Sequence, residues 1–244
     1  MGKKIPANTT LRALDAVAFL NSQDGLALNG MITVNFSQLG LTEEADIKKS
    51  VRRMNEGLNK LIERHTERWR YPAIHTYLYV HEDVATSHGH HLHELVLVPR
   101  GLAPELPGWL HRWADRNYGN VPETAVHYKG QYHTDLDERA ANQARLVRYV
   151  LKSSEDACIR SAEAEPTTLH HILNVARHQR AYCADVHRVV GTSQNISELQ
   201  QLKEGFWRVE QPELALGNHY LQEHRSRLNA TELNAFLERL WEMR

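Results

Sequence analysis

The residues of this chain best suited to chemistry are two histidines, a tyrosine and a lysine. His91 and His93 are separated by one leucine, so in a strand both side chains point to one face, roughly 7 Å apart, where they can share a metal ion. Tyr149 and Lys152 are three residues apart, on one side of a predicted helix. A metal ion, a phenol and an ammonium group are the parts needed to cleave a phosphodiester through a covalent phosphotyrosine.

Both pairs also have plainer explanations. His88 and His90 crowd the same stretch, and such a cluster can trap transition metals adventitiously or simply pack. A free phenol, with a pKa of roughly 10, is a poor nucleophile without help. Lys152 can provide that help, or it can be an ordinary solvated lysine. The alternative nucleophiles are two tyrosines of a predicted strand that lack such a lysine, Tyr128 and Tyr132.

Hydrophobic periodicity predicts a chain of strands and helices in which 74–80 and 90–98 form an antiparallel pair. The predicted strands are 31–36, 74–80, 90–98 and 124–132. The predicted helices are 8–24, 42–69, 106–118 and 137–153, followed in the C-terminal region by helices alone, at 168–184, 194–205 and 231–243. We divide the chain into an N-terminal helical extension (1–27), a central domain (28–157) and an α-helical C-terminal region (158–244).

Three stretches, in this order, resemble the motifs of the HUH endonucleases, and among them the rolling-circle replication initiators of plasmids and small phages. Met31–Phe36 resembles the first-strand motif, His90–Val98 the histidine strand and Arg148–Lys152 the tyrosine helix. The resemblance covers roughly residues 28–157. It implies an α+β fold with a central antiparallel sheet and flanking helices. It also implies metal-dependent nicking of single-stranded or cruciform origin DNA by Tyr149, with Lys152 assisting. The protein would stay joined to the 5′ phosphate and leave a 3′-OH for the host polymerase, working beside a host helicase.

The resemblance also suggests the third metal ligand. Similar initiators carry an acidic ligand at the end of the strand before the histidines, where this chain has Glu82. A hard carboxylate suits Mg²⁺ or Mn²⁺. His81, Asp83 and Glu94 are the other candidates. Glu94 is the weakest, because its parity puts it on the opposite face of the strand from the two histidines.

Overall charge does not by itself indicate nucleic-acid binding, since 29 basic residues face 30 acidic ones. The segment 48–70 is locally basic and could follow a phosphate backbone, although a solvated helix face with Glu/Arg pairs explains it equally well. The predicted DNA contacts are Lys48, Lys49, Arg52 and Arg53 in this segment, Arg148 beside the tyrosine, and Arg188 before a glycine turn that leads into a helix.

Several function classes are disfavoured. The chain has no phosphate-binding loop of the Walker type, so we expect no built-in helicase. It has no apolar leader or anchor, which predicts a cytoplasmic protein away from the membrane, and its two cysteines are too few for a disulfide framework. Three alternatives stay open: a transposase with the same chemistry, a nonenzymatic DNA-binding protein with a relic site, and a metal-dependent hydrolase that does not use Tyr149.

Overall fold

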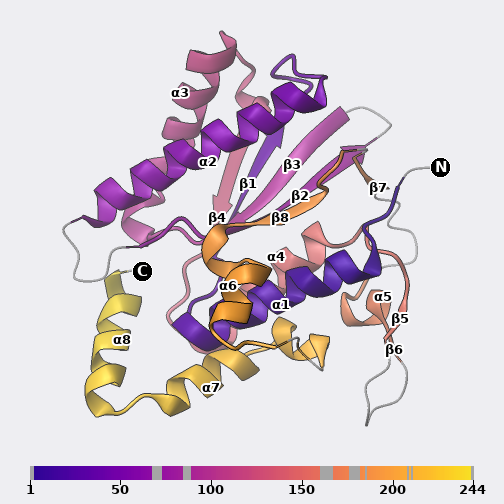
Figure 1. Ribbon diagram of the computed structural model, residues 1–244. Helices are drawn as coiled ribbons and strands as arrows, with labels where there is room; N and C mark the ends of the chain where they lie inside the picture. The colour runs from indigo at the N-terminus through magenta and orange to yellow at the C-terminus, as the bar shows by residue number, and fades with distance from the viewer. Residues whose placement is uncertain are drawn as a thin grey trace.

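The structure, a computed structural model, describes residues 3–67, 73–84, 89–159, 167–175, 182–184, 186–207, 209 and 211–242. Figure 1 shows its helices and strands. The α-helices are α1 (Ala7–Asp24), α2 (Glu44–Thr66), α3 (Leu106–Tyr118), α4 (Leu136–Val150), α5 (Leu169–Ile172), α6 (Glu198–Lys203), α7 (His219–Arg227) and α8 (Ala230–Glu242). The strands are β1 (Gly30–Asn35), β2 (Tyr77–Val84), β3 (Gly89–Val96), β4 (Val126–Gly130), β5 (Cys158–Ile159), β6 (Thr167–Thr168), β7 (Tyr182–Cys183) and β8 (Val190–Thr192).

The central sheet is antiparallel, which confirms the predicted α+β architecture with flanking helices. Its strand order is β4-β1-β3-β2-β7, and β8 also pairs with β2. β1 shows why these segments form strands: Ile32 and Val34 are fully buried while Thr33 between them is half-buried, the alternation that a pleated strand produces. The β2–β3 register sets Glu82 opposite His91, and this pairing builds the candidate site.

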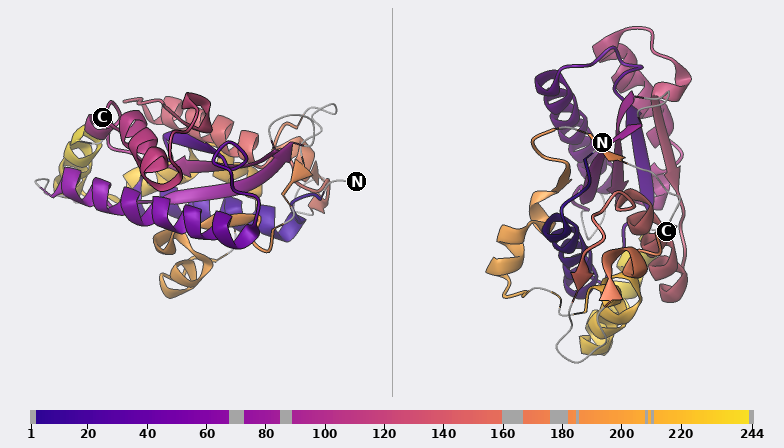
Figure 2. Two further views of the ribbon diagram at one scale, coloured as in Figure 1. Left: turned by 90° about the horizontal axis from the view of Figure 1, so that it is seen from above. Right: turned by 90° about the vertical axis from the view of Figure 1, so that its right-hand side faces the viewer.

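α2 and α4 lie on opposite sides of this sheet (Figure 2). α2 has acidic residues in its first turn and basic residues in its last, as the helix dipole favours. It lies over the face that carries Tyr77 and Tyr79. Asp135 caps the N-terminus of α4, and its side chain accepts hydrogen bonds from the backbone N–H groups of Asp137 and Glu138. The sheet therefore lies between the residues that contact α2 and those that contact α4.

α1 was expected to be a peripheral extension, but it is largely buried. Leu14, Val17 and Leu20 have no exposed surface, and the helix packs against α7, β8 and the 3₁₀ helix Pro212–Leu216. The Gln143 amide of α4 donates a hydrogen bond of 2.9 Å to Asn21 Oδ1 of α1. The residues assigned to an extension thus contribute to the same hydrophobic core as the sheet.

Three further expectations need correction. The prediction that the C-terminal region holds only helices is wrong, because β7 and β8 pair with β2. The helix predicted at 168–184 is the short α5, and 176–181 lie outside the described residues. α4 ends at Val150, so Lys152 lies in the following turn. In the described part of the chain, no helix has the length and apolar character to cross a bilayer.

Candidate active site

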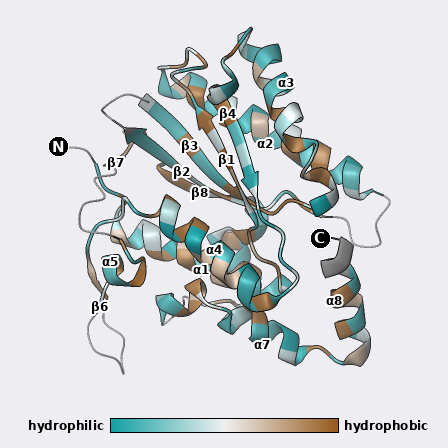
Figure 3. Cartoon of the chain, turned by 180° about the vertical axis from the view of Figure 1, so that it is seen from behind, coloured by the Kyte–Doolittle hydropathy of each residue, from teal (hydrophilic) through white to brown (hydrophobic). Residues whose placement is uncertain are grey.

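Three side chains converge at one end of the β2–β3 pair, which Figure 3 shows as hydrophilic. Because Glu82 is paired with His91 and Val80 with His93, Glu82 and both histidines share one face of the sheet. The Oε2 atom of Glu82 lies 3.0 Å from His93 Nε2 and 3.7 Å from His91 Nε2. All three side chains are buried, and their ligand atoms lie within 4.8 Å of one another.

This geometry fits a metal ion. Two ligand atoms at about 2.1 Å from a common ion, on neighbouring coordination directions, are about 3.0 to 3.4 Å apart, close to the Glu82–His93 and Glu82–His91 separations of 3.0 and 3.7 Å. His93 Nε2 is buried and makes no hydrogen bond of good geometry in the described structure, despite its short contact with Glu82. An unpartnered ring nitrogen facing a carboxylate is what a shared ion would satisfy. The buried Glu82–His91–His93 cluster can therefore hold a metal ion.

The other ring nitrogen of each histidine is already engaged. His91 Nδ1 donates to the backbone carbonyl oxygen of Gly89 at 3.1 Å, and His93 Nδ1 lies 3.0 Å from Thr33 Oγ1. A proton on Nδ1 leaves the lone pair of Nε2 free for an ion. The Gly89 carbonyl oxygen fixes this tautomer for His91, while the Thr33 hydroxyl, which can accept or donate, permits it for His93 and orients the ring. Thr33 was not predicted to be a site residue. Its place in the first-strand motif was the available signal, since β1 pairs Thr33 with His93.

The charges around Glu82 favour its ionised form. Burial alone raises the pKa of the Glu82 carboxyl, but the close imidazoles of His91 and His93 and the nearby Lys152 ammonium outweigh it, so the pKa falls far below its ordinary value. Burial lowers the pKa of His93, although the carboxylate opposes that shift. A deprotonated carboxylate beside a neutral imidazole is the protonation state that metal binding requires.

Tyr149 and Lys152 meet this cluster from α4 and the turn after it. The Tyr149 ring packs edge-on against His93 with ring centres 5.2 Å apart, and the tyrosine is 43 % exposed. Lys152 Nζ lies 2.7 Å from Glu82 Oε2 and 3.9 Å from the centre of the Tyr149 ring. The lysine thus bridges the carboxylate and the ring face of the tyrosine. The structure brings together all five residues predicted for catalysis and metal binding.

The competing ligands do not join the cluster. His81 and Asp83 alternate with Glu82 along β2 and so belong to the opposite face, where His81 Nδ1 lies 2.9 Å from His90 Nε2. Burial and the neighbouring His90 lower the pKa of His81 to about 3, so this ring is neutral near pH 7. Glu94 is also on that face, fully buried, with Oε1 3.5 Å from His75 Nε2.

The alternative tyrosines are poor nucleophiles. The hydroxyl oxygens of Tyr128 and Tyr132 lie 2.6 Å apart, hydrogen-bonded to each other. Burial raises the pKa of Tyr132 to about 12 and raises that of Tyr128 still further. Tyr128 pairs with Ile32 of β1, on the face opposite Thr33 and the metal cluster. Its ring packs over Gly30 and Gly130, where an added Cβ would lie within 3 Å of ring atoms. Tyr128 is therefore a packing residue.

The predicted DNA contacts fall in different places. Arg148 precedes Tyr149 on α4 and is half-buried, and its buried Nε has no hydrogen-bond partner among the described residues, so its contact with DNA stays a prediction. Lys48 and Arg52 line a groove on the α2 side of the sheet, together with Arg188, whereas Lys49 and Arg53 do not line it. The α2 residues thus lie across the sheet from the metal cluster, and their DNA contacts stay a prediction.

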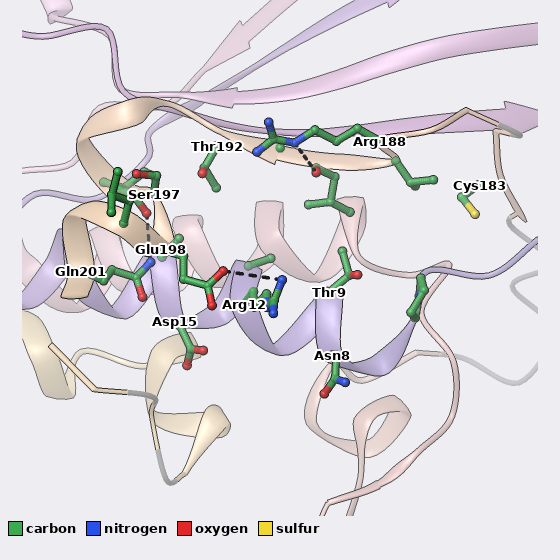
Figure 4. Close-up of a pocket in the computed structure, with 18 of the residues that line it drawn as sticks. Asn8, Thr9, Arg12, Asp15, Cys183, Arg188, Thr192, Ser197, Glu198 and Gln201 are labelled. Carbon is green, nitrogen blue, oxygen red and sulfur yellow. Dashed lines mark hydrogen bonds and ion pairs between the residues drawn. The ribbon is translucent and has the colours of Figure 1, made fainter. Parts of the chain in front are cut away.

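A second hollow, of about 870 Å³, lies between α1, β8 and α6 (Figure 4). Arg12 and Glu198 face each other across it at 3.5 Å. Arg188 stands at its rim and donates from Nε to the carbonyl oxygen of Val190 at 3.3 Å. None of the metal-cluster residues lines this hollow, so it is separate from the chemistry.

Comparison of this chain with known protein families, with curated proteins and with solved structures finds no match. The residues and the site they form are therefore the basis for its function.

Proposed function

We propose that this chain is a rolling-circle replication initiator of the HUH type, which nicks single-stranded DNA with Tyr149. The observation that carries the proposal is the packing of an exposed tyrosine ring against His93 of a buried Glu–His–His cluster. A site that only stores metal does not require a tyrosine at its edge. A tyrosine that only packs does not require metal ligands beside it. A carboxylate with two imidazoles suits Mn²⁺ or Mg²⁺.

In the proposed reaction, the phenol oxygen of Tyr149 attacks the scissile phosphorus in line with the leaving 3′ oxygen. The new bond joins Tyr149 to the 5′ phosphate, the bond from phosphorus to the 3′ oxygen breaks, and the phenol proton passes to solvent while the 3′ oxygen gains one. A bound divalent ion would polarise the phosphate. Because Lys152 Nζ already lies at the carboxylate and the Tyr149 ring, it can neutralise charge that develops on the phosphate oxygens.

The proposal is tested with a pool of labelled single-stranded oligonucleotides and Mn²⁺. We expect a covalent protein–DNA adduct that survives denaturing electrophoresis, and a tryptic peptide in which mass spectrometry finds a nucleotide on Tyr149. Tyr149→Phe removes one oxygen and little packing, so it should abolish the adduct and leave DNA binding nearly intact. Tyr132→Phe is the matched control and should leave the adduct unchanged.

The same assay separates the competing functions. Cleaved DNA with no attached protein would favour the metal-dependent hydrolase, and binding without cleavage would favour the nonenzymatic DNA-binding protein. An adduct that persists at its normal rate in Tyr149→Phe would refute the assignment of the nucleophile. A transposase would form the same adduct on transposon ends, so donor and target oligonucleotides that are joined by the protein would favour it over an initiator.

A further inference from the structure

We propose that the groove between α2 and β2 is a second nucleic-acid site, which binds unpaired nucleotides on the sheet face opposite the metal cluster. The proposal takes the class of ligand from the proposed function, but it does not depend on nicking chemistry. It gives a role to Lys48, Arg52 and Arg188, three predicted DNA contacts that the structure places together and away from Tyr149.

The groove is long and shallow enough for a strand to lie in it. It has a volume of about 1120 Å³, and its α2 wall runs from Glu44 to Glu63. At 1.5 Å per residue that stretch of helix is about 28 Å long, which accommodates several nucleotides. The opposite wall includes 186–188 and 193–195. A hydrogen bond of 2.7 Å from the His187 backbone N–H to Glu44 Oε1 closes one end.

Aromatic side chains form the floor. Tyr77 and Tyr79, two apart on β2, have ring centres 6.2 Å apart and planes inclined by 20°, and His81 continues the row 5.3 Å from Tyr79. Both tyrosines are half-buried, so part of each ring remains accessible. Gly191 of β8 pairs with Tyr79, and a Cβ there would lie 2.4 Å from the ring. The glycine therefore leaves room for the ring to lie over β8. Bases stack on such rings with little preference for sequence.

Three Lys/Arg and three Glu residues line the walls, and two of the cations are available to an anionic strand. Each acidic residue has a partner within the protein: Glu44 accepts from the His187 N–H, Glu63 accepts from Asn59 at 2.6 Å, and Glu56 pairs with Arg52 at 3.6 Å. Within the described part of the chain no carboxylate pairs with Lys48 or Arg188. The two cations stand on facing walls with the tyrosines between them, an arrangement suited to phosphates outside and bases inside.

The groove also contains unsatisfied hydrogen-bond acceptors. The side-chain oxygens of Asn55 and Asn195 are buried without a partner in the described structure, although both residues line the groove. Buried polar atoms without partners are uncommon because they lose their hydration. The N–H groups of bases can satisfy such acceptors. A purely apolar partner, such as the face of another helix, would leave them unsatisfied.

The test compares two pairs of substitutions on one helix. Lys48→Gln with Arg52→Gln removes two charges inside the groove, and Lys49→Gln with Arg53→Gln removes two exposed charges, equally spaced, outside it. Binding of a labelled oligothymidylate is measured by fluorescence anisotropy in excess chelator, with Tyr149→Phe as the background. We expect the groove pair to weaken binding about 10-fold and to reduce the salt slope by about 1.4, or about 0.7 per lost phosphate contact. The control pair should change binding less than about 2-fold. Equal effects of the two pairs would overturn the proposal.

Photocrosslinking distinguishes the groove from the cleavage site. An oligonucleotide with 5-iodouracil is crosslinked to the protein without any substitution, and the crosslinked peptides are identified by mass spectrometry. Crosslinks at Tyr77 or Tyr79 support the groove, even if no Tyr149 adduct ever forms and the proposed function fails. Crosslinks confined to the Tyr149 peptide overturn the groove while leaving the proposed function intact. Arg188→Gln, on the other wall, should reduce crosslinks at Tyr79, and unchanged crosslinks at Tyr79 would count against the groove.

Discussion

Replacing Lys152 by methionine should strengthen metal binding while it slows nicking. Lys152 Nζ lies 2.7 Å from Glu82 Oε2, and the two side chains are only 12 % and 7 % exposed. A divalent ion at the Glu82–His91–His93 cluster must displace this ammonium group or stay close to it. At an effective dielectric constant of about 20, unit charges 4 Å apart interact by about 4 kcal/mol, and a doubly charged ion is repelled more strongly.

The lysine can avoid much of that repulsion by moving its ammonium group into solvent, so the expected gain is smaller. We expect Lys152→Met to raise Mn²⁺ affinity about 10- to 100-fold, or about 1.4 to 2.8 kcal/mol. Isothermal titration of Mn²⁺ without DNA measures this directly. Lys152→Arg keeps the charge and is the control, with affinity expected within about 3-fold of the unchanged protein. Equal or weaker Mn²⁺ binding by Lys152→Met would refute the competition between the ammonium group and the metal.

The single-turnover nicking rate of Lys152→Met should fall although its metal affinity rises. Loss of the cation at Tyr149 should slow cleavage about 10- to 1000-fold, because a few kcal/mol of charge stabilisation is removed while the nucleophile and metal ligands remain. Lys152→Arg should recover part of that loss. A Lys152→Met variant that nicks at the normal rate would make the lysine a metal-site residue only.

Three other predictions concern the site and the fold. Thr33→Val should weaken Mn²⁺ affinity about 10-fold by releasing His93 Nδ1, while Thr33→Ser restores it; unchanged affinity in Thr33→Val would exclude an orienting role. His93→Ala or excess chelator should stop nicking and leave the far-ultraviolet circular dichroism unchanged, because the core lies elsewhere. Since burial raises the pKa of Tyr132 to about 12, above an unfolded value of roughly 10, its contribution to stability is complete below pH 10 and is lost as the pH rises towards 12, by about 1.4 kcal/mol per pH unit. Urea denaturation at pH 9.5 and 11 should show a smaller loss in Tyr132→Phe, and an identical loss would contradict the shifted pKa.

Local patterns in the sequence identified the residues that the structure brings together. Alternation along a strand is a local property, so it predicted that His91 and His93 share a face, as the β3 register shows. Helical periodicity predicted most of α2, α3 and α4. Local patterns did not identify Glu82 as the third metal ligand, because its contact with the histidines arises from pairing between two strands. The resemblance to initiators suggested it.

The tertiary structure decided everything that depends on which surfaces meet. Periodicity shows that α2 has one buried side, but it does not show which face of the sheet that side covers, so Lys48 and Arg52 could not be placed relative to the metal cluster from sequence. β8 has three residues, too few for a periodic signal, and pairs with β2 through contacts far along the chain. The bridge from Lys152 to Glu82 joins residues 70 positions apart. Such contacts are fixed by the packing of the whole core, which no short window of sequence contains.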